Sequence, residues 1–189
     1  TIPVTVQSSP SGRSFTVDGT PYTNSQNFNW IPGSSHTLAA TSPQSGGTGV
    51  QYVWTSWSDG GAISHTVAPG SATTYTANFT TQYFLTMNAG PGGGVSPASV
   101  WTNSGAIVNI SASASNGYTM TGWTGTGSGS FSGTNSSASV MMNGPITQTA
   151  AFITNVLITV QANPAGRSFM VDATNYTSDQ TFSWVPGSP

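Results

Sequence analysis

The 189-residue sequence contains no cysteine, lysine or glutamate. Only 3% of its residues are charged, whereas an ordinary soluble domain carries about 25%. The missing cysteine excludes disulfides, a thiolate nucleophile and thiolate metal ligands. Two arginines cannot form a basic surface, so we expect neither nucleic acid nor an anionic membrane surface as a partner. No apolar run approaches the roughly 18 residues of a membrane span, and we expect no membrane insertion.

The residues that are present indicate a folded, exported protein. Hydrophobic residues make up 35% of the chain and aromatic residues 11%, whereas disordered chains are poor in aromatics. Ser, Thr, Asn and Gly stand where most proteins have Lys and Glu, which is typical of secreted bacterial surface proteins. We therefore expect an extracellular or cell-surface location.

A long repeat organises the chain. Residues 4–34, VTVQSSPSGRSFTVDGTPYTNSQNFNWIPGS, align without a gap with residues 158–188, ITVQANPAGRSFMVDATNYTSDQTFSWVPGS. The offset is 154 positions, because Val4 aligns with Ile158. The chain is therefore about one period of a longer array, followed by the opening of the next period.

A weaker repeat lies inside this period. QYVWTSWSDGG (51–61) resembles GYTMTGWTGTG (117–127), and TYTANFTT (74–81) resembles TQTAAFIT (147–154). We predict two related modules, residues 1–81 and 82–154, and a partial third, residues 155–189, which repeats the first type.

The pattern predicts an all-β fold without significant helix. Short alternating runs rich in Val, Thr, Tyr, Phe and Trp are punctuated by Gly, Pro, Asn and Ser. We expect tandem small antiparallel modules, either sandwich-like or open sheets. Alternate residues of a strand share a face, and this spacing selects the core candidates: Phe15, Val17, Phe28, Trp30, Tyr52, Trp54, Trp57, Phe79, Trp101, Trp123 and Phe152.

These motifs resemble a known family. The Tyr-x4-Trp spacing at Tyr52/Trp57 and Tyr118/Trp123, with the later TANF and TAAF, is similar to the closing half of the divergent internalin-type B-repeat. The second module is the more similar, and the first carries a companion GRSFxVDG…FxWxPG segment. The resemblance implies tandem modules of secreted or surface-attached bacterial proteins with a spacer, stalk or adhesion role. It implies no catalytic residue.

Residues 54–67, WTSWSDGGAISHTV, are the best candidate for chemistry, because Asp59 and His65 lie close in sequence. Asp-Gly-Gly between two alternating runs favours a tight hairpin turn. No His-x3-His spacing, cluster of carboxylates or Gly-x-Ser-x-Gly motif occurs. We predict no catalytic residue, no metal site and no cofactor.

Arg13 and Asp18 recur as Arg167 and Asp172. In a chain with so few charges, this recurrence suggests a role. One interpretation is that each residue makes local hydrogen bonds or an ion pair; another is a contact between modules or between assembled chains. Ligand binding is a third.

The partial repeat suggests assembly. Phe169, Phe182 and Trp184 match core candidates of the first copy, but isolated hairpins are marginal in water. We expect more sequence or strands of a neighbouring chain to complete this segment. The predicted partners are copies of the chain or adjacent repeats, end to end.

The leading function is a non-enzymatic structural repeat of a surface stalk or filament. The alternative is a carbohydrate-binding or adhesive module of a secreted bacterial protein. A third hypothesis is an accessory part of a secreted enzyme whose catalytic domain lies outside this chain. Trp54 and Trp101 have no counterpart in the other module and are the candidates for exposed aromatics that stack on a polysaccharide.

Overall fold

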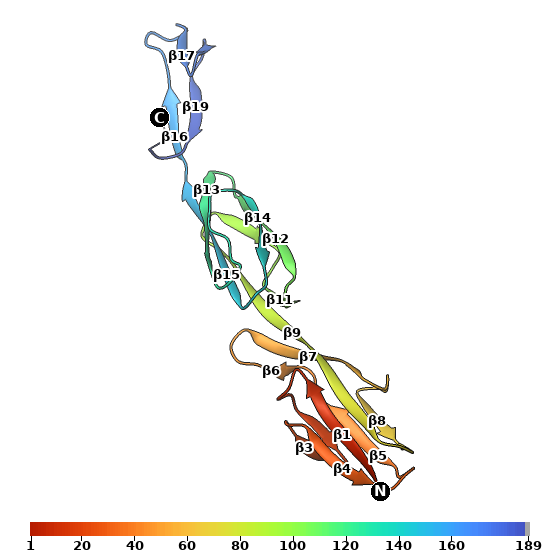
Figure 1. Cartoon of the computed structure of the whole chain (residues 1–189). Coiled ribbons are helices and arrows are strands. Elements are labelled where there is room, and N and C mark those ends of the chain that lie inside the picture. Colours follow the sequence, from red (N-terminus) through yellow and green to blue (C-terminus); the bar gives the residue numbers. More distant parts are fainter. Residues whose placement is uncertain (188–189) are drawn as a thin grey trace. The chain divides into compact units, whose positions relative to one another are not determined.

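The computed structural model describes residues 1–187, and these residues form an all-β fold (Figure 1). They contain no helix, and therefore none that could span a membrane. The first ten strands are β1 (Ile2–Ser9), β2 (Phe15–Val17), β3 (Thr20–Tyr22), β4 (Gln26–Trp30), β5 (His36–Ala40), β6 (Gln44–Ser45), β7 (Val50–Trp57), β8 (Ser64–Val67), β9 (Thr73–Ala89) and β10 (Gly93–Ser96). The others are β11 (Val100–Asn103), β12 (Ile107–Ala114), β13 (Tyr118–Thr126), β14 (Ser137–Met141), β15 (Ile146–Thr154), β16 (Val156–Val160), β17 (Phe169–Val171), β18 (Thr174–Tyr176) and β19 (Gln180–Trp184).

The chain divides into two compact units. The first comprises Thr1–Leu85, Val100–Ala106 and Met141–Ile146, and the second comprises residues 86–99, 107–140 and the chain from 147 onward. Strand β9 is continuous from Thr73 to Ala89. The predicted boundary between residues 81 and 82 therefore falls inside one strand.

Two groups of strands build the first unit. Strands β3, β2, β5 and β8 pair in that order, and β4, β1 and β9 form part of a larger sheet in which β9 also pairs with β7. Alternation along these strands turns their apolar residues to one shared core. The buried members of this core are Val4, Val6, Phe15, Val17, Trp30, Leu38, Trp57, Val67, Tyr75, Ala77 and Phe79.

One pairing differs from the predicted antiparallel arrangement. Strand β1 pairs with β9 in parallel, with Val4 opposite Thr73 and Val6 opposite Tyr75. A parallel pair requires a long connection between its strands, and here the connection includes β2 to β8. The first strand of this unit thus pairs with one of its last strands.

The hairpin predicted at Asp59-Gly60-Gly61 is wrong. A turn does occur, since the amide of Gly60 donates to the carbonyl of Trp57, but β7 pairs with β9 whereas β8 pairs with β5. The two-residue hairpin lies instead at Asp18-Gly19, between paired Val17 and Thr20. Both turn residues have positive φ, 50° and 79°, as a type I′ turn requires.

The second unit repeats the closing strands of the first. In the first, β7 pairs with β9 so that Trp57 lies opposite Ala77, with a bulge after Trp54. In the second, β13 pairs with β15 so that Trp123 lies opposite Ala150, with a bulge after Met120. Trp57 and Trp123 are both buried. The closing strands of the two units thus share the same pairing and the same register shift.

The opening strands recur in the last part of the chain. Strand β16 pairs with β19 in the same register as β1 pairs with β4. Ile2 lies opposite Trp30 in the first copy, and Val156 lies opposite Trp184 in the second. Phe15 opposite Tyr22 becomes Phe169 opposite Tyr176 in β17 and β18. The sequence repeat of 154 positions is thus a structural repeat.

Most of the predicted core aromatics are buried or half-buried. Phe15, Trp30, Trp57, Phe79 and Trp123 are buried, and Phe28, Tyr52 and Trp54 pack against the core. Trp101 is the exception, because 36% of its surface is exposed. Its strand β11 pairs with β9, and alternation alone could not tell which face of that strand is covered.

Candidate functional site

A cluster of polar side chains surrounds Asp18. The ring nitrogen Nδ1 of His36 lies 2.7 Å from Oδ2 of Asp18, and the amide of Thr37 donates to Oδ1 at 2.8 Å. On the other side of the ring, Nε2 lies 2.9 Å from the hydroxyl of Ser34. The turn at Asp18-Gly19 presents the carboxylate to the start of β5, and the ring of Trp30 stacks on that of His36 with centroids 3.8 Å apart.

The order Ser34, His36 and Asp18 matches the connectivity of a hydrolase triad. The hydroxyl of Ser34, however, also donates to the carbonyl of Ile31 at 2.7 Å. The nearby amides of Gly33 and Ser34 donate to Pro69 and Ile31, so neither is free to bind an oxyanion. The cluster is therefore built to hold the start of β5 to the β2–β3 turn.

The electrostatics of Asp18 follow from these contacts. The hydrogen bond from His36 is the main reason that the pKa of the Asp18 carboxyl lies below its ordinary value, and the amide of Thr37 adds to the effect. Both donors favour the charged form of the carboxylate. Because 52% of the Asp18 side chain is exposed, solvent screens part of this interaction.

The second histidine is paired in the same way. Nε2 of His65 lies 3.0 Å from Oδ2 of Asp59, and Nδ1 lies 2.8 Å from the carbonyl oxygen of Ala62. Oδ1 of Asp59 accepts the amide of Gly61 at 3.1 Å. Asp59 and His65 thus close the loop that follows Trp57, whose ring meets that of His65 edge-on. Within residues 1–187 no three His, Cys, Asp or Glu side chains come together.

Arg13 and Asp18 do not pair with each other. The guanidinium of Arg13 lies over the ring of Tyr52, 3.9 Å from its centroid, which is a cation–π geometry. In the second copy, Arg167 and Asp172 are both exposed. The backbone of Asp172 nevertheless has a φ of 48°, close to the 50° of Asp18, so the turn is formed although the contacts around it are not.

The aromatic residues of the partial repeat keep their local geometry. Phe169, Tyr176, Phe182 and Trp184 form a series of ring contacts with centroid distances of 5.5 to 5.7 Å, as Phe15, Tyr22, Phe28 and Trp30 do in the first copy. Phe169, Phe182 and Trp184 are only half-buried.

The two candidate binding aromatics differ in exposure. Trp54 packs against the core of the first unit. Trp101 is exposed, rests on Phe84 with ring centroids 5.1 Å apart, and lines a groove of about 330 Å³ with Gln44 and Gln51. Trp101 is therefore the one of the two that could stack on a ligand.

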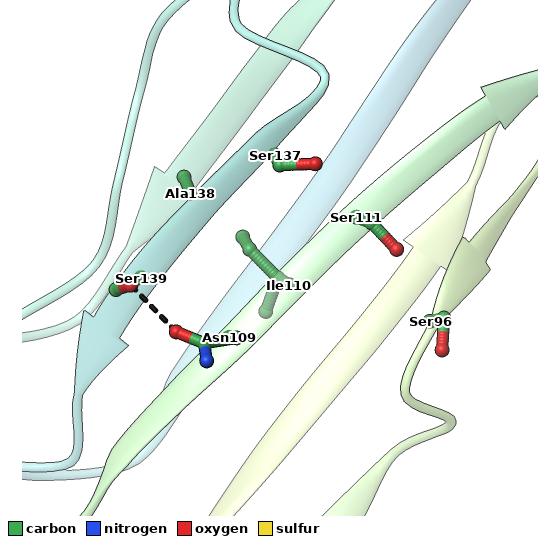
Figure 2. Close-up of a pocket in the computed structure, with 7 residues that line it drawn as sticks. All are labelled: Ser96, Asn109, Ile110, Ser111, Ser137, Ala138 and Ser139. Atoms are coloured by element: carbon green, nitrogen blue, oxygen red, sulfur yellow. Dashed lines mark hydrogen bonds between the residues drawn. The ribbon is translucent and has the colours of Figure 1, made fainter.

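A second groove, of about 360 Å³, lies over β12 and β14 and is lined by hydroxyl groups. Figure 2 shows Asn109 and Ser139 pointing toward each other, and the hydroxyl of Ser139 donates to Asn109 at 2.7 Å. Ser111 and Ser137 line the same groove. It contains no titratable side chain, so it can form hydrogen bonds but supplies no acid or base.

The strands from the second half of β9 to the start of β16 carry a family signature. A model of the divergent InlB B-repeat domain matches residues 83–156. This supports a bacterial surface repeat family, and it confirms the resemblance for the second module. The match covers fewer than half of the 189 residues, and the companion segment at residues 12–33 lies outside it. No curated protein and no solved structure matches the chain.

The family occurs in bacterial surface proteins and is not a known enzyme family. Its match therefore agrees with a surface repeat, and the triad-like cluster lies outside the matched residues.

Sequence reasoning did not find the partners of the recurring charges. His36 lies 18 positions from Asp18, and Tyr52 is still farther along the chain from Arg13. One signal was available: with so few charged residues, both histidines and the aromatics are the natural partners for the charges. Only the fold decides which of them pair.

We predict that Asp18→Asn destabilises the first unit by about 1 kcal/mol near neutral pH, since it removes a charge-assisted hydrogen bond that is partly exposed. Because the folded-state pKa is lowered, the contribution of Asp18 is complete above the ordinary Asp pKa. It is lost as the pH falls through the lower folded-state value. Urea unfolding from about pH 5 to about pH 2 should show the difference from wild type shrinking toward the acid end.

The matched control is Asp179→Asn, because Asp179 is exposed and makes no hydrogen bond or ion pair with any described residue. It should leave the unfolding free energy unchanged. A difference between wild type and Asp18→Asn that persists unchanged at the lowest pH would contradict the assignment of this pKa shift to the folded-state contacts.

Proposed function

We propose that the chain is a non-enzymatic, extracellular repeat unit of a surface stalk or filament. The observation that carries this proposal is the structural recurrence at 154 positions, in which β16–β19 repeat the pairing of β1–β4 residue for residue. Tandem repeats in which each period contacts only its neighbours form an open array, and each added period then extends the array by a constant amount.

The chemistry of the surface supports the same role. The net charge is −2 and only six residues carry a formal charge. Both histidines are held by aspartates, and the grooves are lined by neutral hydroxyl and amide groups. Such a surface changes little with pH or salt, because it has few groups to titrate and few charges to screen. This suits a spacer outside the cell.

The proposal predicts how size scales with repeat number. Chains with one, two and three copies of residues 1–154, each followed by residues 155–189, should show a maximum dimension in small-angle scattering that rises by an equal step per copy. A compact protein instead grows with a weak power of chain length, with an exponent of about 0.38 for the radius of gyration. Growth with that weak exponent would contradict the stalk.

A second candidate function is binding of a neutral polysaccharide. The observation that favours it is the exposed Trp101, which rests on Phe84 beside a groove lined by Gln44 and Gln51. An exposed ring offers a stacking face, and the amides offer hydrogen bonds without charge. The absence of lysine, and the lack of any arginine in this groove, favour a neutral ligand over an acidic one.

This candidate predicts that soluble neutral glucans change the tryptophan fluorescence of the chain, and that Trp101→Ala abolishes the change. The matched control is Ile31→Ala, which removes an apolar side chain that is 69% exposed in the same unit. Binding that survives Trp101→Ala, or no binding by the wild type, would rule out this candidate function.

A further inference from the structure

The last four strands present an apolar face that is covered in the first copy. In the first copy Val4, Val6, Phe15 and Val17 are at most 3% exposed. Their counterparts Ile158, Val160, Phe169 and Val171 are not buried, and Ile158 is 36% exposed. The strands that supply the difference are β5, β7, β8 and β9, which provide Leu38, Trp57, Val67 and Tyr75 to the first core.

Two strand edges are open at the same place. In the first copy β1 pairs with both β4 and β9, and β2 pairs with both β3 and β5. Among the described residues, β16 pairs only with β19 and β17 only with β18. An open edge without lysine is free to accept another strand. The edges of β16 and β17 that correspond to the paired edges of β1 and β2 therefore have no strand partner among the described residues.

We propose that the face formed by β16–β19 is a docking surface for a second copy of the strand set β5–β9, residues 36–85. The occupant would pair its β9 in parallel with β16, with Tyr75 opposite Val160, and its β5 antiparallel to β17, with Leu38 opposite Val171. These registers are those of the first copy moved by the repeat offset. The inference rests on the proposed repeat function and names the partner of the open repeat.

The recurring polar residues fit this occupant. Asp18 holds the amide of Thr37 and the ring of His36, and Arg13 lies over Tyr52. All three partners belong to residues 36–57. Asp172 already has the backbone conformation of Asp18, and Arg167 and Trp184 occupy the positions of Arg13 and Trp30. The docking surface thus supplies a counterpart for each contact, which accounts for the recurrence of these two charges.

A different occupant would leave these groups unpaired. A second β16–β19 unit could pair edge to edge, but it would bring another arginine and aspartate and neither the ring of Tyr52 nor the amide of Thr37. Such pairing would appear as a concentration-dependent dimer of the 189-residue chain. That dimer is one outcome that would count against the proposal.

The test appends residues 36–85 to the full chain directly after Pro189, where the repeat offset places His36. Because the chain has no cysteine, introduced cysteines report the register. Thr16 lies opposite Ala39 in the first copy, so Met170→Cys should form a disulfide with Ala39→Cys of the appended copy. Directly opposed Cβ atoms are about 5 Å apart, and diagonal ones about 7–8 Å. The in-register disulfide should therefore form about tenfold faster than one from Met170→Cys to Thr37→Cys of the appended copy.

The positive control is the pair Thr16→Cys and Ala39→Cys in the first copy. A rate for the Met170 pair no greater than that of the off-register pair would overturn the docking. That result would not bear on the stalk, which is tested separately by the stepwise lengthening of longer arrays.

A second variant checks the polar contacts without cysteines. In the extended chain Asp172→Asn should lower the unfolding midpoint of the module formed by β16–β19 and the appended copy, because it removes the contacts to Thr37 and His36 of that copy. In the 189-residue chain the same substitution should change nothing, since Asp172 is exposed there. An equal effect in both chains would overturn the assigned role of Asp172.

Discussion

The first unit depends on a core shared by strands that lie far apart in sequence. Val4 and Val6 of β1 are fully buried in a core that β5, β7, β8 and β9 complete, and β9 pairs with β1 in parallel about 70 positions later. Closing so long a segment costs conformational entropy before the apolar contacts form. The opening strands therefore cannot secure their own core, and their stability comes from the closing strands.

The partial repeat shows what this constraint means for a tandem protein. Strands β16–β19 keep the pairing, turn and ring geometry of β1–β4, yet their apolar residues stay exposed or half-buried. Local pairing thus fixes the shape of the opening strands. Burial of their apolar residues is seen only in the first copy, where β5, β7, β8 and β9 complete the core. In the first copy Arg13 contacts Tyr52 of β7 and Asp18 contacts β5, so two of the scarce charges lie where the opening strands meet the rest of the unit.

Much of the fold could be predicted from the sequence because alternation reports strand faces locally. It located buried Phe15, Val17 and Trp30, and the internal repeat placed Trp57 and Trp123 at equivalent sites. Alternation could not predict which strands pair with each other. The dipeptide Asp-Gly occurs at Asp18-Gly19 and at Asp59-Gly60, but only the first joins two strands that pair with each other. The parallel β1–β9 pair, the exposure of Trp101 and the contact between His36 and Asp18 all depend on long-range packing that no local pattern contains.

Hydrogen exchange of the unmodified 189-residue chain tests the shared core most directly. Strands β1 and β16 have equivalent sequences and equivalent partners in β4 and β19, and they differ in whether closing strands cover them. The account predicts that backbone amides of β16 and β17 exchange much faster than the equivalent amides of β1 and β2, because local opening is easier where few apolar groups are buried. Equal protection in the two copies would contradict it, since the opening strands would then be stable without the rest of the module.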